Sequence, residues 1–315
     1  MVGPKKKREI DLGVVIGKIR MKNPITVASG TFGCGEELEE LTELGKLGAI
    51  VTKTVTKRAR EGNRPPRIAE TASGMLNSIG LENGGIDRFI ADKMPYLRNI
   101  GIPVIVSIGG ERGNEFIELA ERLDETDGVS GIEVNISCPN LEGKGQGLFS
   151  QDAKLTYGLV KKIKKATSLT VITKLTPNVT DITKIAKAAC DAGSDALSLV
   201  NTYTGMAVNI HTRRPRLGNI TGGLSGPAIK PLALKAVWDV YNSVDIPIIG
   251  MGGVATTEDA IEFIICGATA VALGSTNFVY PNKYVEIIDG LAYHIKSNKM
   301  VNMNALTGSL KVRKR

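Results

Sequence analysis

Short apolar runs rich in β-branched residues recur along the chain and alternate with longer segments of helical period. Eight such runs occur, at residues 24–29, 49–56, 103–108, 131–137, 170–175, 196–202, 246–250 and 268–274. They are apolar almost throughout, which is typical of strands covered on both faces. Eight strand–helix alternations favour a closed parallel barrel over an open sheet. The predicted fold class is therefore α/β, a (β/α)8 TIM barrel.

The segments between these runs carry helical patterns. The clearest is 181–192, where the apolar residues fall on one face and Asp181 can cap the start. The other predicted helices are 36–46, 114–125, 152–166, 229–242, 257–266 and 282–296. Residues 12–23 predict an N-terminal hairpin that closes the bottom of the barrel. Residues 204–225 predict a long insertion after strand six, and long loops of this kind are usually functional.

The chain has 315 residues, of which 42% are hydrophobic, and this is enough to bury a large core. The uniform alternation predicts a single barrel domain over residues 12–296. Residues 1–11 are expected to form a basic N-terminal tail, and residues 297–315 a C-terminal tail.

The net charge is +8, and eight cationic residues stand in the two tails: Lys5, Lys6, Lys7, Arg8, Lys311, Arg313, Lys314 and Arg315. The body between the tails is therefore close to neutral. A nucleic-acid-binding protein normally carries its basic patch on the folded body, so nucleic acid is not an expected partner. Solvated tails and tails that bind an acidic partner are both compatible with this pattern.

The four cysteines, Cys34, Cys138, Cys190 and Cys266, form no C-x2-C pair, so zinc and iron–sulfur ligation by this chain are not expected. No apolar stretch resembles a signal peptide or approaches the roughly 20 residues of a membrane span. We therefore expect a soluble cytoplasmic protein with free thiols, without a metal site and without a membrane partner.

Polar residues cluster at the carboxyl ends of the predicted strands, where barrels of this type place their active sites. They are Ser29, Lys53, Thr54, Ser107, Asn135, Cys138, Lys174, Asn201 and Thr202. So many buried polar groups would be costly without partners. The pattern predicts a ring of ligand contacts.

Glycines follow the last two predicted strands. Gly252 and Gly253 follow strand seven, where Thr256 or Thr257 can cap the next helix, and Gly274 with Ser275 follows strand eight. Bare backbone N–H groups beside a helix N-terminus favour a phosphate, and barrels use these two loops for that purpose. Ordinary strand–helix turns would also explain the glycines.

The side chains available for proton transfer are few. His211 lies in the insertion and His294 in the last helix, and both are interpreted as structural or exposed. Cys138 stands at the top of strand four among Asn135, Pro139 and Asn140, where a thiol could take a moderately acidic proton. A small buried hydrophobe is the alternative for Cys138, and it suits Cys190 and Cys266 better; Cys34 stays undecided. The glycine-rich segment 141–149 is either a lid over the site or a passive loop.

Several sequence blocks are more specific than these patterns. They are SGT at 29–31, KTVT at 53–56, MLNSIGL at 75–81, NISCPN at 135–140, KLTPNVTDI at 174–182, NT at 201–202, NITGGLSGPAIKP at 219–231, GMGGV at 250–254 and GS at 274–275. In order and spacing the chain resembles class 1 dihydroorotate dehydrogenases over roughly residues 10 to 290. The blocks at 174–182 and 219–231 are most similar to the NAD-linked class 1B branch.

The resemblance implies oxidation of (S)-dihydroorotate to orotate in de novo pyrimidine (UMP) synthesis, with FMN as cofactor. Cys138 is implied as the base that takes a proton from C5 of the substrate, while a hydride leaves C6 for N5 of the flavin. The implied substrate contacts are Lys53, Asn77, Ser78, Ile79, Gly80, Leu81, Asn135, Asn140, Asn201 and Thr202. Lys53 would pair with the substrate carboxylate, and the asparagine amides would match the donors and acceptors of the ring.

The implied flavin contacts are Ser29, Lys53, Thr54, Ser107, Asn135, Lys174, Val200, Gly226, Gly252, Gly253, Gly274 and Ser275. Lys174 would stand at the N1/O2 edge, where a cation stabilises the negative charge of reduced flavin. The last four residues would hold the phosphate. Members of the family usually carry Asn where this chain has Ser107, whose shorter reach puts that one contact in doubt.

The resemblance also implies a route for the electrons. The chain has neither a Rossmann fingerprint nor an iron–sulfur cysteine set, so FAD and a [2Fe–2S] cluster are expected only on a partner subunit that passes electrons to NAD. A homodimer of this chain joined to two such subunits would form a heterotetramer. In a class 1A enzyme, fumarate would accept the electrons directly.

Three other functions fit parts of the pattern. A dihydropyrimidine dehydrogenase-like subunit would act on uracil or thymine, but its acid cysteine is expected in the loop at 147–151, which has none. An RNA-binding dihydrouridine synthase-like flavoprotein fits the basic tails but not the neutral body. A non-catalytic flavin-binding scaffold would need no reactive thiol at Cys138.

Overall fold

The computed structural model describes residues 10–136 and 149–312. Its main sheet has eight parallel strands in the order β3-β16-β15-β10-β9-β8-β7-β4. These are β3 (Ile25–Val27), β4 (Ile50–Val51), β7 (Val104–Ile108), β8 (Gly131–Asn135), β9 (Thr170–Lys174), β10 (Ala196–Leu199), β15 (Ile248–Met251) and β16 (Ala270–Leu273). Gly48 N–H donates to Ile25 O at 2.9 Å and Thr26 Oγ1 to Ala49 O at 2.8 Å, which brings the two edges together. The predicted TIM barrel is confirmed.

Burial explains why the strands read as apolar runs rather than as alternating patterns. Every residue of β7, β8 and β9 is buried, because one face of each strand fills the barrel and the other packs under helices. The register of β8 on β9 runs from Gly131 opposite Thr170 to Asn135 opposite Lys174. The polar ends of these neighbouring strands therefore meet at the same rim of the barrel.

The outer layer consists of α3 (Gly113–Asp124), α4 (Ala153–Ala166), α5 (Ile182–Asp191), α6 (Lys230–Tyr241), α7 (Thr257–Ile265) and α9 (Lys283–Ser297), with a short α8 (Thr276–Val279). All six long helices occur where the periodicity predicts them. Asp181 caps α5 by accepting the N–H of Thr183 at 3.0 Å, and Thr256 caps α7. Short 3-10 turns precede α4 and α6, namely η5 (Phe149–Gln151) and η6 (Pro227–Ile229).

The helix predicted at 36–46 is wrong. That segment forms two 3-10 helices, η1 (Glu36–Leu41) and η2 (Leu44–Lys46), and η1 buries none of its residues. Its sequence EELEEL offers too little apolar surface to hold an α-helix against the barrel, and its carboxylates repel one another.

The helical segment before β7 is not among the predicted helices. It consists of α1 (Ile86–Arg88), a π-helical turn η3 (Phe89–Lys93) and α2 (Met94–Asn99). The changes of helix type break the 3.6-residue period, and Pro95 interrupts the pattern near the start of α2, so local periodicity is a weak signal here.

The N-terminal hairpin is present as predicted. It pairs β1 (Val14–Ile16) with β2 (Ile19–Met21) in antiparallel register. Lys18 N–H donates to Thr170 Oγ1 at 3.0 Å, at the beginning of β9, and Ile16 and Ile19 are buried. The hairpin therefore covers the amino-terminal end of the barrel.

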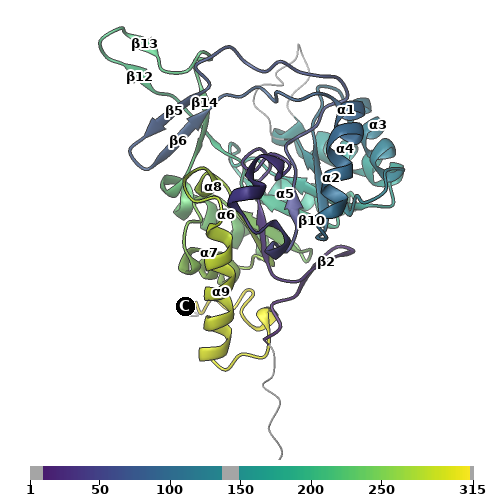
Figure 1. Ribbon diagram of the computed structural model, residues 1–315, viewed down its shortest axis with the longest axis vertical. Helices are drawn as coiled ribbons and strands as arrows, with labels where there is room; N and C mark the ends of the chain where they lie inside the picture. Colours follow the sequence, from purple (N-terminus) through teal and green to yellow (C-terminus); the bar gives the residue numbers. More distant parts are fainter. Residues whose placement is uncertain (1–9, 137–148, 313–315) are drawn as a thin grey trace, which may run out of the picture.

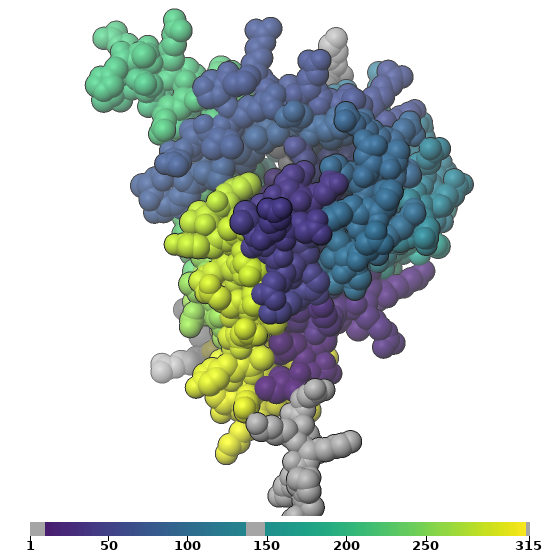
Figure 2. Space-filling view, viewed as in Figure 1, coloured from purple at the N-terminus to yellow at the C-terminus, as the bar shows by residue number. Residues whose placement is uncertain are grey.

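A second, antiparallel sheet covers the opposite end. Its order is β11-β14-β6-β5, formed by β11 (Tyr203–Gly205), β14 (Gly222–Ser225), β6 (Gly74–Asn77) and β5 (Ile68–Thr71). The predicted insertion after β10 thus folds into strands, including the hairpin β12 (Val208–Asn209) with β13 (Arg214–Pro215). Figure 1 shows β5, β6 and β14 gathered at one end of the molecule, and Figure 2 shows the β12–β13 hairpin standing out from the body.

The segment after α9 does not extend from the barrel as a tail. It forms the short 3-10 helix η7 (Met303–Ala305), buries Met303 and Leu306, and Gly308 N–H donates to Ile264 O at 3.0 Å. These two buried side chains, with the backbone hydrogen bonds of Gly308 and Leu310 to the end of α7, hold part of this segment against the barrel. None of the helices in residues 10–136 and 149–312 combines the length and apolarity needed to cross a lipid bilayer.

Candidate active site

A cavity of about 850 Å³ opens over the carboxyl ends of the barrel strands, beneath the small sheet. Its wall brings together most of the site residues that the sequence predicts: Ser29, Lys53, Thr54, Asn77, Ile79, Gly80, Leu81, Asn135, Lys174, Val200, Asn201, Thr202, Gly226, Gly252, Gly253, Gly274 and Ser275. Residues 219–223 of the insertion line it as well, so the long loop after β10 forms part of the wall.

Two predicted contacts lie behind the wall. Ser107 is fully buried, and its Oγ is 2.9 Å from Thr54 Oγ1, so it supports Thr54 instead of facing the cavity. Ser78 is also buried; its N–H donates to Arg67 O at 2.7 Å, and its Oγ accepts from Asn63 Nδ2 at 2.9 Å. The Ser78 N–H is therefore used within the fold and is not offered to a ligand.

Two predicted residues, Cys138 and Asn140, lie outside the described residues, as do residues 1–9 and all of the glycine-rich segment 141–149 except Phe149. Phe149 itself packs edge-on against Phe116 of α3, with 6.2 Å between the ring centroids.

Hydrogen bonds link the polar side chains along the barrel rim. Ser29 Oγ lies 3.0 Å from Thr54 Oγ1, and Asn135 Nδ2 donates to the same oxygen at 3.4 Å. Asn201 Nδ2 in turn donates to Asn135 Oδ1 at 3.4 Å, and Thr202 N–H donates to Asn201 Oδ1 at 2.8 Å. Side chains at or just after the carboxyl ends of β3, β4, β8 and β10 therefore orient one another.

Two lysines contribute positive charge to the wall, and they differ in their partners. Lys53, after β4, takes part in no ion pair within the described residues, so its ammonium group is available to an anion. Lys174, at the end of β9, donates to Glu133 Oε1 at 3.2 Å, and both side chains are buried. Ser198 Oγ donates to the other carboxylate oxygen of Glu133 at 2.9 Å. Glu133 is absent from the predicted set, although a charge inside the apolar run at 131–137 was an available signal.

The upper wall depends on a contact between distant parts of the chain. Asn77 stands opposite Gly223 in the β6–β14 pair, and its Nδ2 donates to Gly223 O at 3.3 Å across 146 positions of sequence. A Cβ atom on Gly223 would lie only 2.0 Å from Thr202 Oγ1, so glycine is required for this close approach. The pairing thus sets Asn77 and Thr202 on the same cavity.

Asn178 also lines the cavity and was not predicted as a site residue. Its Nδ2 donates to Thr202 O at 3.0 Å, and its Oδ1 accepts the N–H of Thr204 at 2.9 Å. Gln151 Nε2 donates to Asn178 O at 3.3 Å. One asparagine after β9 therefore holds the loop that carries Asn201 and Thr202, and its place inside the KLTPNVTDI block was the available signal.

An arginine–glutamate pair completes the upper wall. Arg67 and Glu82 both line the cavity and form an ion pair with each other. Arg67 Nε also donates to Asn63 O at 2.5 Å and Nη2 to Glu61 O at 2.9 Å. These residues lie in an irregular stretch without a motif, so the sequence offered no signal for them.

The glycines at the last two strand ends leave space for a ligand. A Cβ atom on Gly274 would meet nothing within 4 Å, and the same holds for Gly30 across the rim. Gly252 and Gly253 have positive φ angles of 125° and 77°, and Gly253 packs against Lys230 and Gly226 O. The bare backbone here, beside the N-terminus of α7, can hold an anionic group such as the phosphate of a flavin mononucleotide. The cavity is also large enough for a planar cofactor with a ligand stacked on it.

The cysteines within the described residues are poor bases. Cys34 is buried, and burial, with the nearby carboxylate of Glu37, raises the pKa of its thiol to about 11. Burial is also the main cause that raises the pKa of Cys190 and of Cys266 on the helix surfaces. None of the three lines the cavity. Within the described residues, no cluster of three or more His, Cys, Asp or Glu side chains could hold a metal ion.

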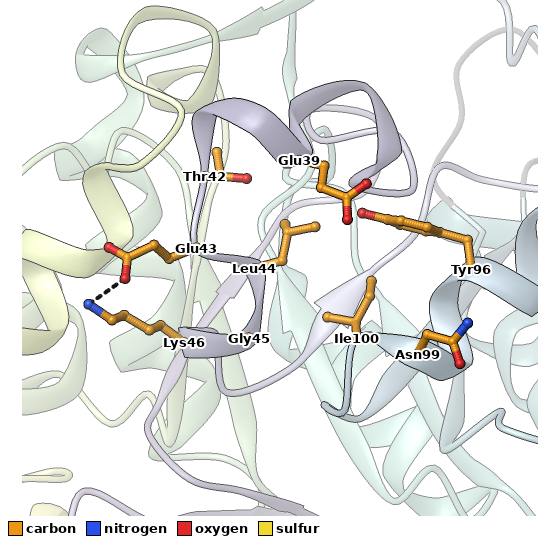
Figure 3. A pocket seen from close by; sticks show the side chains of 9 residues that line it. All are labelled: Glu39, Thr42, Glu43, Leu44, Gly45, Lys46, Tyr96, Asn99 and Ile100. Atoms are coloured by element: carbon orange, nitrogen blue, oxygen red, sulfur yellow. Dashed lines mark ion pairs between the residues drawn. The ribbon is translucent and has the colours of Figure 1, made fainter.

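A second hollow of about 580 Å³ lies on the side of the barrel, away from the strand ends (Figure 3). It is lined by Glu39, Thr42, Glu43, Leu44, Gly45, Lys46, Tyr96, Asn99 and Ile100. Lys46 already pairs with Glu43 at 2.8 Å, and Glu39 faces Tyr96 across the opening. Burial raises the pKa of Tyr96, and the Glu39 carboxylate adds to the effect. The hollow does not combine available cations with open backbone N–H groups, as the strand-end cavity does.

Comparison with known proteins identifies the family of the chain. The family model described as dihydroorotate dehydrogenase matches residues 11–295. The chain is 50% identical over 303 residues to the dihydroorotate dehydrogenase B (NAD(+)) catalytic subunit of Thermoanaerobacter sp. (strain X514), covering 96% of this chain and 100% of that one. The subunit of the same name from Desulforamulus reducens is 50% identical, with 96% and 99% covered, and that from Geotalea uraniireducens is 48% identical, with 95% and 98% covered. The chain belongs to the dihydroorotate dehydrogenase family.

Proposed function

We propose that this protein oxidises (S)-dihydroorotate to orotate with bound FMN, as the catalytic subunit of an NAD-linked enzyme. The observation that carries the proposal is the cavity at the strand ends. It combines the available Lys53, a ring of amides and a glycine-lined anion cradle formed by Gly252, Gly253, Gly274 and Ser275. Family membership and relatives named as NAD(+)-dependent catalytic subunits support it.

The flavin would lie across the mouth of the barrel. Its phosphate suits the backbone of Gly252, Gly253, Gly274 and Ser275, where the open space beside Gly274 leaves room for it. Ser29, Thr54, Val200 and Gly226 would line the ring and the ribityl chain. Bound FMN would supply the acceptor for the hydride that leaves C6 of the substrate.

The substrate is an anionic planar ring, and the remaining wall suits it. Lys53 would pair with its carboxylate, aided by backbone N–H groups of Ile79, Gly80 and Leu81. Asn77, Asn135, Asn140 and Asn201 would bind the amide edges of the ring, each offering both a donor and an acceptor, and Thr202 would complete the set. The hydrogen bonds of Asn135, Asn201 and Thr202 with one another hold these groups in place.

Cys138 is the proposed base, which would accept the C5 proton. We expect Cys138→Ala to retain FMN but to lose the dihydroorotate-dependent bleaching of the flavin by about 100-fold or more, since a positioned base contributes at least that much. Cys190→Ala is the matched control, because it removes another thiol from a helix surface outside the cavity. Both variants would be followed by stopped-flow absorbance at neutral pH. Undiminished flavin reduction in Cys138→Ala would remove this thiol from the mechanism.

The electrons would pass to a partner subunit that carries FAD and a [2Fe–2S] cluster and then to NAD. A homodimer of this chain with two such partners is the assembly we propose. The test is to purify the chain with and without its co-expressed partner and to offer NAD, fumarate and a dye. We expect the chain alone to reduce only the dye and the complex to reduce NAD. Reduction of fumarate by the chain alone would instead assign direct transfer, and turnover of uracil in place of dihydroorotate would overturn the proposed substrate.

A further inference from the structure

A buried acid lies directly behind the cationic wall of the cavity. The Glu133 carboxylate, on β8, accepts from Lys174 Nζ at 3.2 Å and from Ser198 Oγ at 2.9 Å, so both of its oxygens are engaged. The side chains of Lys174 and Glu133 are only 5% and 2% exposed. Lys174 lines the cavity, whereas Glu133 does not. The acid can therefore reach a bound ligand only through the lysine.

Packing alone does not call for a charge at this position. The residues in register with Glu133 on the two neighbouring strands, Ser107 and Ile172, are buried and uncharged. Replacing a buried ion pair by well-packed apolar residues is often neutral or stabilising, because desolvation of two charges is costly. A role for Glu133 in setting the charge that Lys174 presents is the simpler explanation of a carboxylate here.

The effect of the pair on the cavity follows from Coulomb attraction. An unpaired ammonium group in a buried wall would attract negative charge in the cavity strongly, since few water molecules screen it. With Glu133 behind Lys174, the positive charge of the lysine is nearer to the cavity and still dominates at short range. The electric field of the pair, however, decays more steeply with distance than that of the lysine alone. The carboxylate also restricts the long lysine side chain to one direction, and Ser198 restricts the carboxylate.

We propose that Glu133 is a positioning residue that aims Lys174 at the flavin and offsets part of its charge. The reduced flavin is thereby stabilised enough to accept electrons from the substrate but not so much that it retains them. This inference rests on the proposed function, because it takes FMN as the occupant of the cavity.

Glu133→Gln tests the charge while keeping the shape and one acceptor oxygen for Lys174. In the FMN-loaded variant we expect the equilibrium between oxidised and reduced flavin to move about tenfold toward the reduced form. For a two-electron couple this is a positive shift of about 30 mV, measured against a reference dye. Reduction by dihydroorotate should persist, while reoxidation by an added acceptor should slow by about tenfold.

Ser198→Ala is the matched control. It removes a hydrogen bond to the same carboxylate without changing the charge, so we expect a much smaller change in potential. A structural disturbance of β8 and β10 would instead move both variants alike. If Glu133→Gln folds poorly, the neutral double variant Lys174→Met with Glu133→Gln replaces it, and its flavin should have a more negative potential than the wild-type flavin.

The outcomes separate this inference from the proposed function. A wild-type chain that binds no FMN would overturn the proposed function and this inference with it. A wild-type chain that binds FMN and is reduced by dihydroorotate, beside a Glu133→Gln variant with unchanged potential and unchanged reoxidation, would overturn the inference alone. An unchanged potential in the neutral double variant would do the same.

Discussion

Lys53 carries a positive charge on the cavity wall that is available to an anionic ligand. Lys174 is held by Glu133, and Arg67 is held by Glu82, whereas Lys53 takes part in no ion pair in the described part of the chain. An anionic substrate therefore meets one uncompensated ammonium group on the wall. Because that group lies in a partly enclosed cavity, its pairing with a carboxylate should exceed that of a surface ion pair.

We predict that Lys53→Met weakens orotate binding by about 10- to 100-fold, the cost of a lost charge-assisted hydrogen bond. The measurement is titration of the flavin absorbance with orotate. Lys57→Met is the control, since Lys57 pairs with Glu118 on the surface only four positions along the chain. An orotate dissociation constant that is unchanged in Lys53→Met would contradict the assignment.

At the level of elements, the anion cradle depends on how α6 and α7 begin. Lys230, the first residue of α6, donates to Asp259 Oδ1 at 2.6 Å and pairs with Glu262 at 2.8 Å on α7. Asp259 also accepts the N–H groups of Ala255 and Thr256 at 2.9 and 3.0 Å, which completes the cap of α7. Since Gly253 packs directly on Lys230, the ion pair braces the loop that carries the glycines.

The ion pair between Lys230 and Asp259 should make the stability of the fold depend on pH. Burial raises the pKa of Asp259, but the hydrogen bonds from Lys230, Ala255 and Thr256 outweigh it and leave the pKa below its usual value. The hydrogen bond to Asp259 leads the causes that raise the pKa of Lys230. Because the pKa of the Asp259 carboxyl is lowered by folding, its ionised form stabilises the fold at pH values above the unfolded pKa of about 3.9. This contribution disappears as the pH falls through the folded pKa. Because the pKa of Lys230 is raised by folding, its charged form stabilises the fold at pH values below the unfolded pKa of about 10.4. This contribution is lost as the pH rises through the folded pKa.

We therefore predict that Asp259→Asn lowers the free energy of unfolding by about 1–2 kcal/mol at pH 7, from the lost cap and charge-assisted hydrogen bonds. The deficit relative to wild type should shrink as the pH falls from about 4 toward the lowered pKa of the folded carboxylate, because the wild type loses the contribution of the ionised group over that range. Urea unfolding at several pH values measures this. Asp239→Asn is the control, because Asp239 pairs with Lys235 on the exposed face of α6. A deficit in Asp259→Asn that stays constant down to pH 3 would contradict the ion-pair explanation.

At the scale of the whole molecule, the cavity is where the barrel and the small sheet meet, so its occupant should stabilise both. The walls come from β3, β4, β8, β9, β10, β15 and β16 below and from β6 and β14 above. A ligand that binds only this folded arrangement raises the free energy of unfolding by mass action. Removal of the cofactor should therefore be visible as a loss of stability of the entire chain.

We predict that FMN at about 100 times its dissociation constant stabilises the protein by about 2.7 kcal/mol, which appears as a rise in Tm of several degrees. Gly274→Val should leave the Tm of the FMN-free protein nearly unchanged, because a side chain there meets open space, but it should abolish most of the rise. Gly158→Val in α4 is the control, since its added Cβ also meets open space but lies outside the cavity. A full rise in Gly274→Val would place the phosphate elsewhere.

Much of this architecture can be predicted from local sequence patterns. Three kinds of local feature can be recognised: the eight apolar runs, the caps at Asp181 and Thr256, and the glycine-containing turns at 252–253 and 274–275. Burial on both faces, helix capping and turn geometry each act over a few residues. Because active sites of such barrels lie at the carboxyl ends of the strands, the sequence also predicts that Lys53, Asn135 and Lys174 belong to one site. The helix predicted at 36–46 is wrong because η1 buries none of its residues against the barrel, and the local period does not reveal this.

The tertiary structure alone decided the contacts between distant segments. It set Asn77 against Gly223, placed Glu133 under Lys174, and moved Ser107 behind Thr54. It also packed Met303 and Leu306 against the barrel where the sequence suggested a tail. Such contacts depend on strand register and on which surfaces meet after folding, and no stretch of a few residues encodes either. The sequence by itself therefore determined the barrel and the rim of the site, while the fold decided which charge stands behind which side chain.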